Sequence, residues 1–144
     1  MTDPLSLVAD VGGTNTRVAL AGPGGLRRDT VARVRNAEAH GLPQVLAAYC
    51  ADRGVTPQAV CVDVAGPVEN GVGRLTNLAW EAAPAALCAA TGAGRAVVLN
   101  DLQAMGMAVA HLGADALMPL LAGPAAPPDA TRLVVNVGTG LNAQ

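Results

Sequence analysis

Short apolar runs that end in glycine mark the first part of the chain. Residues 5–9 are apolar and lead into Asp10 and two glycines, and residues 17–21 resume the apolar pattern and end in the glycine-rich segment 22–25. This pattern predicts two buried strands joined by a tight glycine turn. Residues 30–35 mix valines with arginines, which predicts a half-exposed third strand.

The hydrophobic period changes after residue 40. Apolar side chains recur three and four residues apart from Leu42 to Cys50, which predicts a helix with one apolar face that stops at Gly54. An alanine-rich segment, residues 84–91, ends at a glycine and predicts a second helix. Residues 102–112 repeat the helical spacing and predict a third helix.

Apolar runs at residues 59–65, 95–99 and 132–137 predict further buried strands. A turn at residues 69–71 precedes a short additional strand, and residues 123–129 hold three prolines and predict a surface loop. Three strands are thus followed by alternating helices and strands. This order predicts a mixed β-sheet flanked by helices, an α/β domain of the ribonuclease-H-like class.

Composition excludes several kinds of protein. The 144 residues are 51% hydrophobic and 14% charged, with a formal net charge of −2. Such a chain can bury a core and is not intrinsically disordered. The lack of a basic cluster excludes general nucleic-acid binding, because that binding depends on phosphate neutralisation. All basic residues are arginines, so no lysine can serve a P-loop or form a Schiff base.

Cysteine usage and hydropathy indicate the compartment. The chain lacks an apolar run of the roughly 20 residues that a membrane-spanning helix needs, and its start lacks the basic residues of a signal peptide. Cys50, Cys61 and Cys88 are odd in number and widely spaced. They fit a reducing compartment rather than a disulfide framework or a zinc site. We expect a cytoplasmic protein with no membrane partner, whose cysteines are inert core residues.

The segment between the first two predicted strands carries the clearest chemistry. Residues 10–17 read Asp-Val-Gly-Gly-Thr-Asn-Thr-Arg. Successive backbone N–H groups in a glycine turn form a concavity that binds anions. The Arg17 guanidinium suits a phosphate, and the Asp10 carboxylate suits a hydrated Mg²⁺ beside it. Asparagine and glycine also form plain β-hairpins, but the complete run between two strands favours phosphate binding.

Two other segments directly follow predicted strands. Asn100 and Asp101 stand at the carboxyl end of a strand, where open α/β sheets bind ligands. Taken alone, Asp101 is better explained as a helix cap or first-turn residue, although a carboxylate there can also accept a substrate proton. Residues 138–140, Gly-Thr-Gly, taken alone form an ordinary turn. As a second strand–glycine–threonine turn, they suggest a second clamp on one polyphosphate.

A fourth group of residues gives weaker signals. Asn77 offers a donor and an acceptor to a sugar hydroxyl, and Gly66 follows a predicted buried strand. Trp80 is expected in the core, because a lone tryptophan in an apolar chain usually packs there. None of these residues is diagnostic by itself.

Together, and in this order, the segments resemble the bacterial glucokinases. That family is related to the ROK sugar kinases within the superfamily of sugar kinases, chaperone ATPases and actin. Residues 10–17 resemble its first phosphate motif, and residues 76–80, 99–101 and 137–141 resemble later motifs. Asn142 stands where the family usually has glycine. The resemblance covers essentially the whole chain and implies the ribonuclease-H-like fold of the actin-like ATPase superfamily.

The resemblance implies ATP-dependent phosphorylation of the glucose 6-hydroxyl with Mg²⁺. It implies that Asp101 is the general base, that Asn100, Asn77 and Gly66 bind the sugar, and that Asp10 orients the metal through water. The phosphate-binding residues that it implies are Gly12, Gly13, Thr14, Asn15, Arg17, Gly138 and Thr139.

Members of that family are roughly twice as long, about the size of two domains. Residues 1–144 are therefore expected to form the smaller N-terminal lobe of a two-lobe kinase, inactive alone. The absent C-terminal lobe would supply the adenosine pocket and a Glu/His group at the sugar. Dimers are frequent in the family, so a homodimer is one expected state. Two alternatives stay open, a non-catalytic sugar- or nucleotide-binding module and a kinase for another hexose.

Overall fold

The computed structural model describes residues 4–121, 123–125, 127, 129–137 and 141–143. The chain divides into two compact units, Met1–Asp101 and Leu102–Gln144. The boundary falls at the start of a helix, one residue after the last strand of the larger unit.

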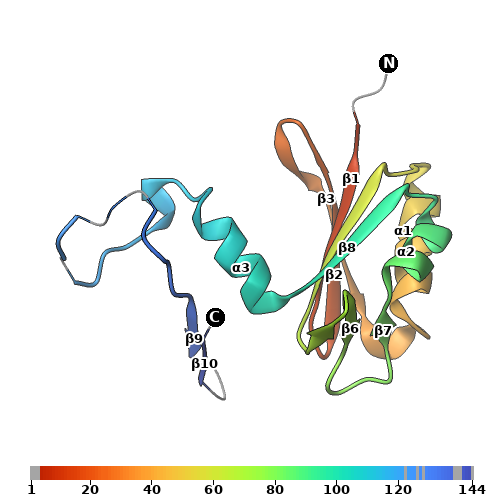
Figure 1. Ribbon diagram of the computed structural model, residues 1–144. Coiled ribbons are helices and arrows are strands. Elements are labelled where there is room, and N and C mark those ends of the chain that lie inside the picture. Colours follow the sequence, from red (N-terminus) through yellow and green to blue (C-terminus); the bar gives the residue numbers. More distant parts are fainter. Residues whose placement is uncertain (1–3, 122, 126, 128, 138–140, 144) are drawn as a thin grey trace. The chain divides into compact units, whose positions relative to one another are not determined.

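The larger unit is built on a five-stranded sheet with the strand order β3-β2-β1-β4-β8 (Figure 1). Its strands are β1 (Ser6–Val11), β2 (Asn15–Gly22), β3 (Gly25–Arg35), β4 (Ala59–Val64) and β8 (Arg95–Asn100). β1 pairs antiparallel with β2 and parallel with β4, and β4 pairs parallel with β8. The predicted mixed sheet is thus confirmed. β3 begins five residues earlier than predicted, because Gly25 follows the tight turn from β2 directly.

Two helices lie on the same side of this sheet, α1 (Leu42–Arg53) and α2 (Pro84–Thr91) (Figure 1). Each has a proline in its first turn and ends at a left-handed glycine, Gly54 with φ 61° and Gly92 with φ 74°. Proline suits the first turn because its missing N–H has no helical partner there, and glycine adopts positive φ without steric cost. Both helices end where the sequence predicts.

The core lies between these helices and the sheet. Alternate residues of the strands are buried against the apolar stripes of α1 and α2, as the two-residue period of a strand requires. The fully buried side chains include Leu7, Val62, Leu46 and Leu87, and Trp80 is buried as predicted. The intervening strand residues face the other side of the sheet.

A small antiparallel sheet joins the larger unit, in the order β5 (Val68–Glu69), β6 (Val72–Arg74) and β7 (Glu81–Ala82). Asn70 and Gly71 both have positive φ in the turn between β5 and β6, as a primed hairpin turn requires. Gly73 lies so close to the core that an added Cβ would stand 2.7 Å from Val64 Cγ2. A glycine is therefore required for β6 to pack on the sheet. The sequence predicted the turn and the strand after it, but neither β5 nor β7.

The second unit contains α3 (Asp101–Val109), a short 3₁₀ turn at Ala114–Ala116, β9 (Val135–Val137) and β10 (Leu141–Ala143). The first residue of α3, Asp101, belongs to the larger unit. α3 ends three residues before the predicted end, and β9 begins three residues after the predicted start. β10 pairs antiparallel with β9 and was not predicted. Within the described part of the chain, no helix combines the length and apolar character needed to cross a bilayer.

Candidate functional site

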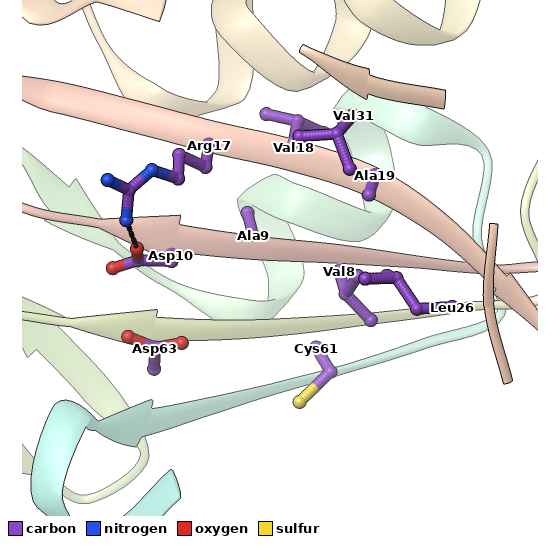
Figure 2. A pocket seen from close by; sticks show the side chains of 10 residues that line it. All are labelled: Val8, Ala9, Asp10, Arg17, Val18, Ala19, Leu26, Val31, Cys61 and Asp63. Atoms are coloured by element: carbon purple, nitrogen blue, oxygen red, sulfur yellow. Dashed lines mark hydrogen bonds and ion pairs between the residues drawn. The ribbon is translucent and has the colours of Figure 1, made fainter. Parts of the chain in front are cut away.

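A row of charged side chains crosses the carboxyl end of the sheet. Asp10 on β1 is in register with Arg17 on β2 and with Asp63 on β4. Arg17 Nη1 donates to Asp10 Oδ2 at 3.0 Å (Figure 2). The two side chains are 63% and 51% exposed. An ion pair so open to solvent adds little stability, so both groups are accessible to a ligand.

Asp63 is a member of this row that the sequence reasoning missed. Burial and the neighbouring carboxylates of Asp10 and Asp101 raise the pKa of Asp63 to about 6. Asp63 occupies the same place in β4 as Asp10 in β1, one residue before the strand ends. An acidic residue in an otherwise apolar strand was the signal that could have identified it.

A shallow cavity of about 260 Å³ adjoins the row on the sheet face that α1 and α2 do not cover (Figure 2). Its apolar wall includes Leu26 and Val31, which are about half exposed. Cys61 also lines it and is exposed, so the prediction that all three cysteines are core residues is wrong for Cys61. Its side chain points to the opposite face from its buried neighbours on β4. Partial burial and then the Asp63 charge raise the pKa of the Cys61 thiol, which disfavours the reactive thiolate.

The predicted phosphate turn closes the hairpin between β1 and β2. The Gly12 amide donates to the Asn15 carbonyl at 3.0 Å, and Gly13 and Thr14 are exposed at the tip. The plain hairpin interpretation is therefore correct as a description of the backbone. It does not exclude phosphate binding, because the same turn presents exposed backbone at the sheet edge where β1, β4 and β8 end.

Two of the predicted sugar-binding residues are in direct contact. Asn100 Nδ2, at the end of β8, donates to the Gly66 carbonyl oxygen at 3.0 Å, although the two residues are far apart in sequence. A Cβ on Gly66 would collide with the Arg74 carbonyl oxygen. Glycine at this position lets the loop after β4 approach the small sheet closely enough to hold the Asn100 amide.

The third predicted sugar-binding residue lies beside the phosphate turn. An added Cβ on Gly13 would stand 3.4 Å from Asn77 Nδ2. Asn77 lies in the turn between β6 and β7 and is exposed. The structure thus places a residue of the proposed sugar site against a residue of the proposed phosphate site.

Comparison with known proteins assigns the chain to a family. The family model for glucokinase matches residues 7–143. The chain belongs to the glucokinase family. Its relatives include the glucokinase of Chromohalobacter salexigens, which is 35% identical over 142 residues. That match covers 98% of this chain and 44% of the relative, so the chain spans less than half the length of this curated family member.

Solved structures agree with the family and with the fold. A glucokinase from an Antarctic psychrotroph is 28% identical, with a TM-score of 0.82 over 99% of this chain and 46% of that one. A ROK glucokinase from Streptomyces griseus, solved with glucose and AMPPNP, is 21% identical and has a TM-score of 0.65 over 96% of this chain and 43% of its own. The expected ribonuclease-H-like fold of the actin-like ATPase superfamily is confirmed.

Asp101 directly follows Asn100 and is the first residue of α3. A carboxylate in the first turn complements the helix dipole, so the structural explanation of Asp101 holds. Its charge also contributes to the raised pKa of Asp63, which places the two carboxylates near each other. In this glucokinase-family chain, the role of Asp101 as general base stays a prediction.

Two predicted phosphate-binding residues, Gly138 and Thr139, lie outside the described residues, so the second phosphate turn also stays a prediction. Among the residues that the structure describes, no group of three or more His, Cys, Asp or Glu side chains forms a metal centre. Mg²⁺ beside a nucleotide needs only one or two protein carboxylates, because water and phosphates complete its shell. The exposed Asp10 carboxylate fits that requirement.

Proposed function

We propose that the chain is the N-terminal lobe of a two-lobe glucokinase that transfers the γ-phosphoryl group of ATP to the 6-hydroxyl of glucose. One observation carries the proposal. The turn suited to phosphate and the Asn100–Asp101 pair stand at the same edge of one sheet, where the parallel strands β1, β4 and β8 end. Ligands of open α/β sheets bind at that edge.

Asn100 and Asn77 would bind the sugar through hydrogen bonds. The contact with the Gly66 carbonyl fixes the orientation of the Asn100 carboxamide, and a fixed carboxamide can discriminate between hydroxyl positions. Asn77 lies beside Gly13, so a sugar held there is adjacent to the phosphate turn. That adjacency supports phosphoryl transfer over separate binding of sugar and nucleotide.

Asp101 would accept the proton of the 6-hydroxyl. As that oxygen bonds to the γ-phosphorus, the bond between phosphorus and the β,γ-bridging oxygen breaks and ADP leaves. Phosphoryl transfer requires mainly positioning and charge neutralisation, and a carboxylate that faces the acceptor hydroxyl removes its proton. Asp101 is the carboxylate next to the sugar-binding Asn100, which favours it over Asp10 and Asp63.

The nucleotide phosphates would be held by backbone amides and Arg17. Gly12, Gly13, Thr14 and Asn15 form the turn, and Gly138 and Thr139 would form the second one. Asp10 would hold Mg²⁺ through water, and when bound that ion would neutralise phosphate charge. Because the chain has no lysine, these groups would provide all of this lobe's neutralisation of phosphate charge.

A coupled assay of the full-length gene product with glucose and MgATP tests the proposal. We expect turnover, and we expect Asp101→Asn to lower kcat by about 10²–10⁴-fold. Asp52→Asn, the same change on the exposed surface of α1, should leave kcat unchanged. Unchanged turnover in Asp101→Asn would refute the base assignment. Preference for another hexose, or binding without turnover, would support the corresponding alternative.

A further inference from the structure

A buried asparagine outside every recognised motif contacts the phosphate turn. Asn36 begins the short 3₁₀ turn after β3 and is only 2% exposed. Its Nδ2 donates to the Gly12 carbonyl at 2.8 Å, and its Oδ1 accepts from Thr16 Oγ1 at 2.8 Å. Its backbone amide donates to the Thr14 carbonyl at 2.9 Å. Asn36 therefore hydrogen-bonds to residues at the start, the tip and the end of the turn.

These bonds determine where the turn amides point. In a planar trans peptide, the carbonyl and the following N–H point in opposite directions, and the described chain has no cis peptide bond. Because the Gly12 carbonyl is held toward buried Asn36, the Gly13 N–H is directed away from it, toward the exposed side of the turn. The bond to the Thr14 carbonyl directs the Asn15 N–H away from Asn36 in the same way.

Only a carboxamide of this length meets both side-chain requirements. The Gly12 carbonyl needs a donor, and the fully buried Thr16 hydroxyl donates to an acceptor. An aspartate supplies no donor when ionised, and an aliphatic side chain supplies neither group. Either replacement would leave a buried polar group without its partner, which a folded chain avoids by moving the backbone.

We propose that Asn36 is a positioning residue that aims the Gly13 and Asn15 amides of this turn at the nucleotide phosphates. The proposal rests on the proposed function of that turn. Electrostatic stabilisation depends on donors that are already oriented before the ligand arrives, and small misplacements of such groups cost large factors in rate or affinity. Asn36 touches no substrate and acts through the backbone of its neighbours.

The test compares Asn36→Asp with Tyr49→Phe. Tyr49 also makes a buried hydrogen bond to the same segment of chain, from its hydroxyl to the Thr30 carbonyl of β3 at 2.7 Å, but it lies away from the turn. Thr16→Val and Thr16→Ser remove and retain, respectively, the hydroxyl that Asn36 accepts. For each variant of the 144-residue chain, NMR would give the hydrogen-exchange rates of the Gly12 and Gly13 amides, and a melt would give Tm. The same variants of the full-length protein would give the Kd for MgATP.

We expect Asn36→Asp and Thr16→Val to weaken MgATP binding by at least about tenfold and to accelerate exchange at Gly12 by a similar factor. Thr16→Ser, which retains the hydroxyl, should keep the Kd for MgATP and the Gly12 exchange rate at the parent values. Tyr49→Phe should lower Tm without changing either the Kd or Gly12 exchange. Equal Kd values in Asn36→Asp and Tyr49→Phe would overturn the proposal. If the full-length protein binds no MgATP, phosphate binding by this turn is refuted, and unchanged exchange in Asn36→Asp would then separately refute the positioning role.

Discussion

Asp63 on β4 lies directly opposite Asp10 on β1 in the parallel pairing of the two strands. Residues in register on neighbouring strands point to the same face, so the two carboxylates repel each other across the sheet. Arg17 offsets the negative charge of Asp10 through their ion pair. Burial first, and then the charges of Asp10 and Asp101, disfavour the ionised form of Asp63 in the folded chain.

This relationship predicts that Asp63→Asn stabilises the chain at alkaline pH. The folded-state pKa of about 6 lies above the ordinary value of 3.8, so the folded state favours the protonated form, and stability is lost as the pH rises through 6. After discounting for solvent screening, we expect a gain of about 1–2 kcal/mol at pH 8 and almost none at pH 4. Urea unfolding of both proteins at the two pH values measures this gain in the free energy of unfolding. Exposed Asp52→Asn is the control, and an equal gain at both pH values would contradict the explanation.

Arg17→Gln should separate stability from ligand binding. Because the Arg17–Asp10 pair is exposed, its loss should change the free energy of unfolding by less than about 1 kcal/mol. The Kd for MgATP should rise by about tenfold in low salt, and the difference should shrink as NaCl is added and screens the charge. Arg28 is also an exposed arginine but lies on β3, and Arg28→Gln should leave the Kd for MgATP unchanged. A Kd effect that does not depend on salt would argue against a charge contact.

Gly66→Ala should destabilise the chain strongly. The new methyl group would collide with the Arg74 carbonyl oxygen, and a backbone atom cannot move aside as a flexible side chain can. We expect a loss of about 2–3 kcal/mol in chemical unfolding, typical of overpacking. Gly24→Ala provides the matched change, since no atom lies within 4 Å of its added Cβ, and it should cost less than about 0.5 kcal/mol. Equal effects of the two substitutions would refute the close approach.

Asn100→Asp should impair glucose binding. The change keeps the shape of the side chain but replaces the donor that meets the Gly66 carbonyl with an oxygen. We expect a stability loss of about 1–3 kcal/mol and an increase in the KM for glucose of the full-length protein by at least about tenfold. Gln44→Glu, a matched change at an exposed amide on α1 that keeps its acceptor oxygen, serves as control. An unchanged KM would remove Asn100 from the sugar site.

The sequence predicted those elements whose ends are marked by local chemistry. Gly54 and Gly92 terminate α1 and α2 because each occupies a left-handed conformation that glycine adopts most easily. β5, β7 and β10 were missed because strands of two and three residues form only through their partners. No local pattern distinguishes them from loop.

The candidate site divides in the same way. The turn at residues 10–17 was predicted because its residues form a contiguous motif. Asn100, Asn77 and Gly66 were grouped by family resemblance. Asp63 was missed because its significance depends on the register between β1 and β4. Asn36 was missed because its contacts with Gly12 and Thr16 exist only after β3 has folded back along β2.

The central place of β1 also sets an order in which the two halves of the site can form during synthesis. β1 pairs with β2 across a short turn, whereas its other edge must wait for β4, where Val60 is the partner of Leu7. Local pairings form quickly and distant ones slowly, so the phosphate turn and Asn36 can assemble while the residues around Asn100 are still being added by the ribosome. During that interval the free edge of β1 can pair with another nascent chain. The delay before β4 emerges is therefore a period when this polypeptide is exposed to aggregation.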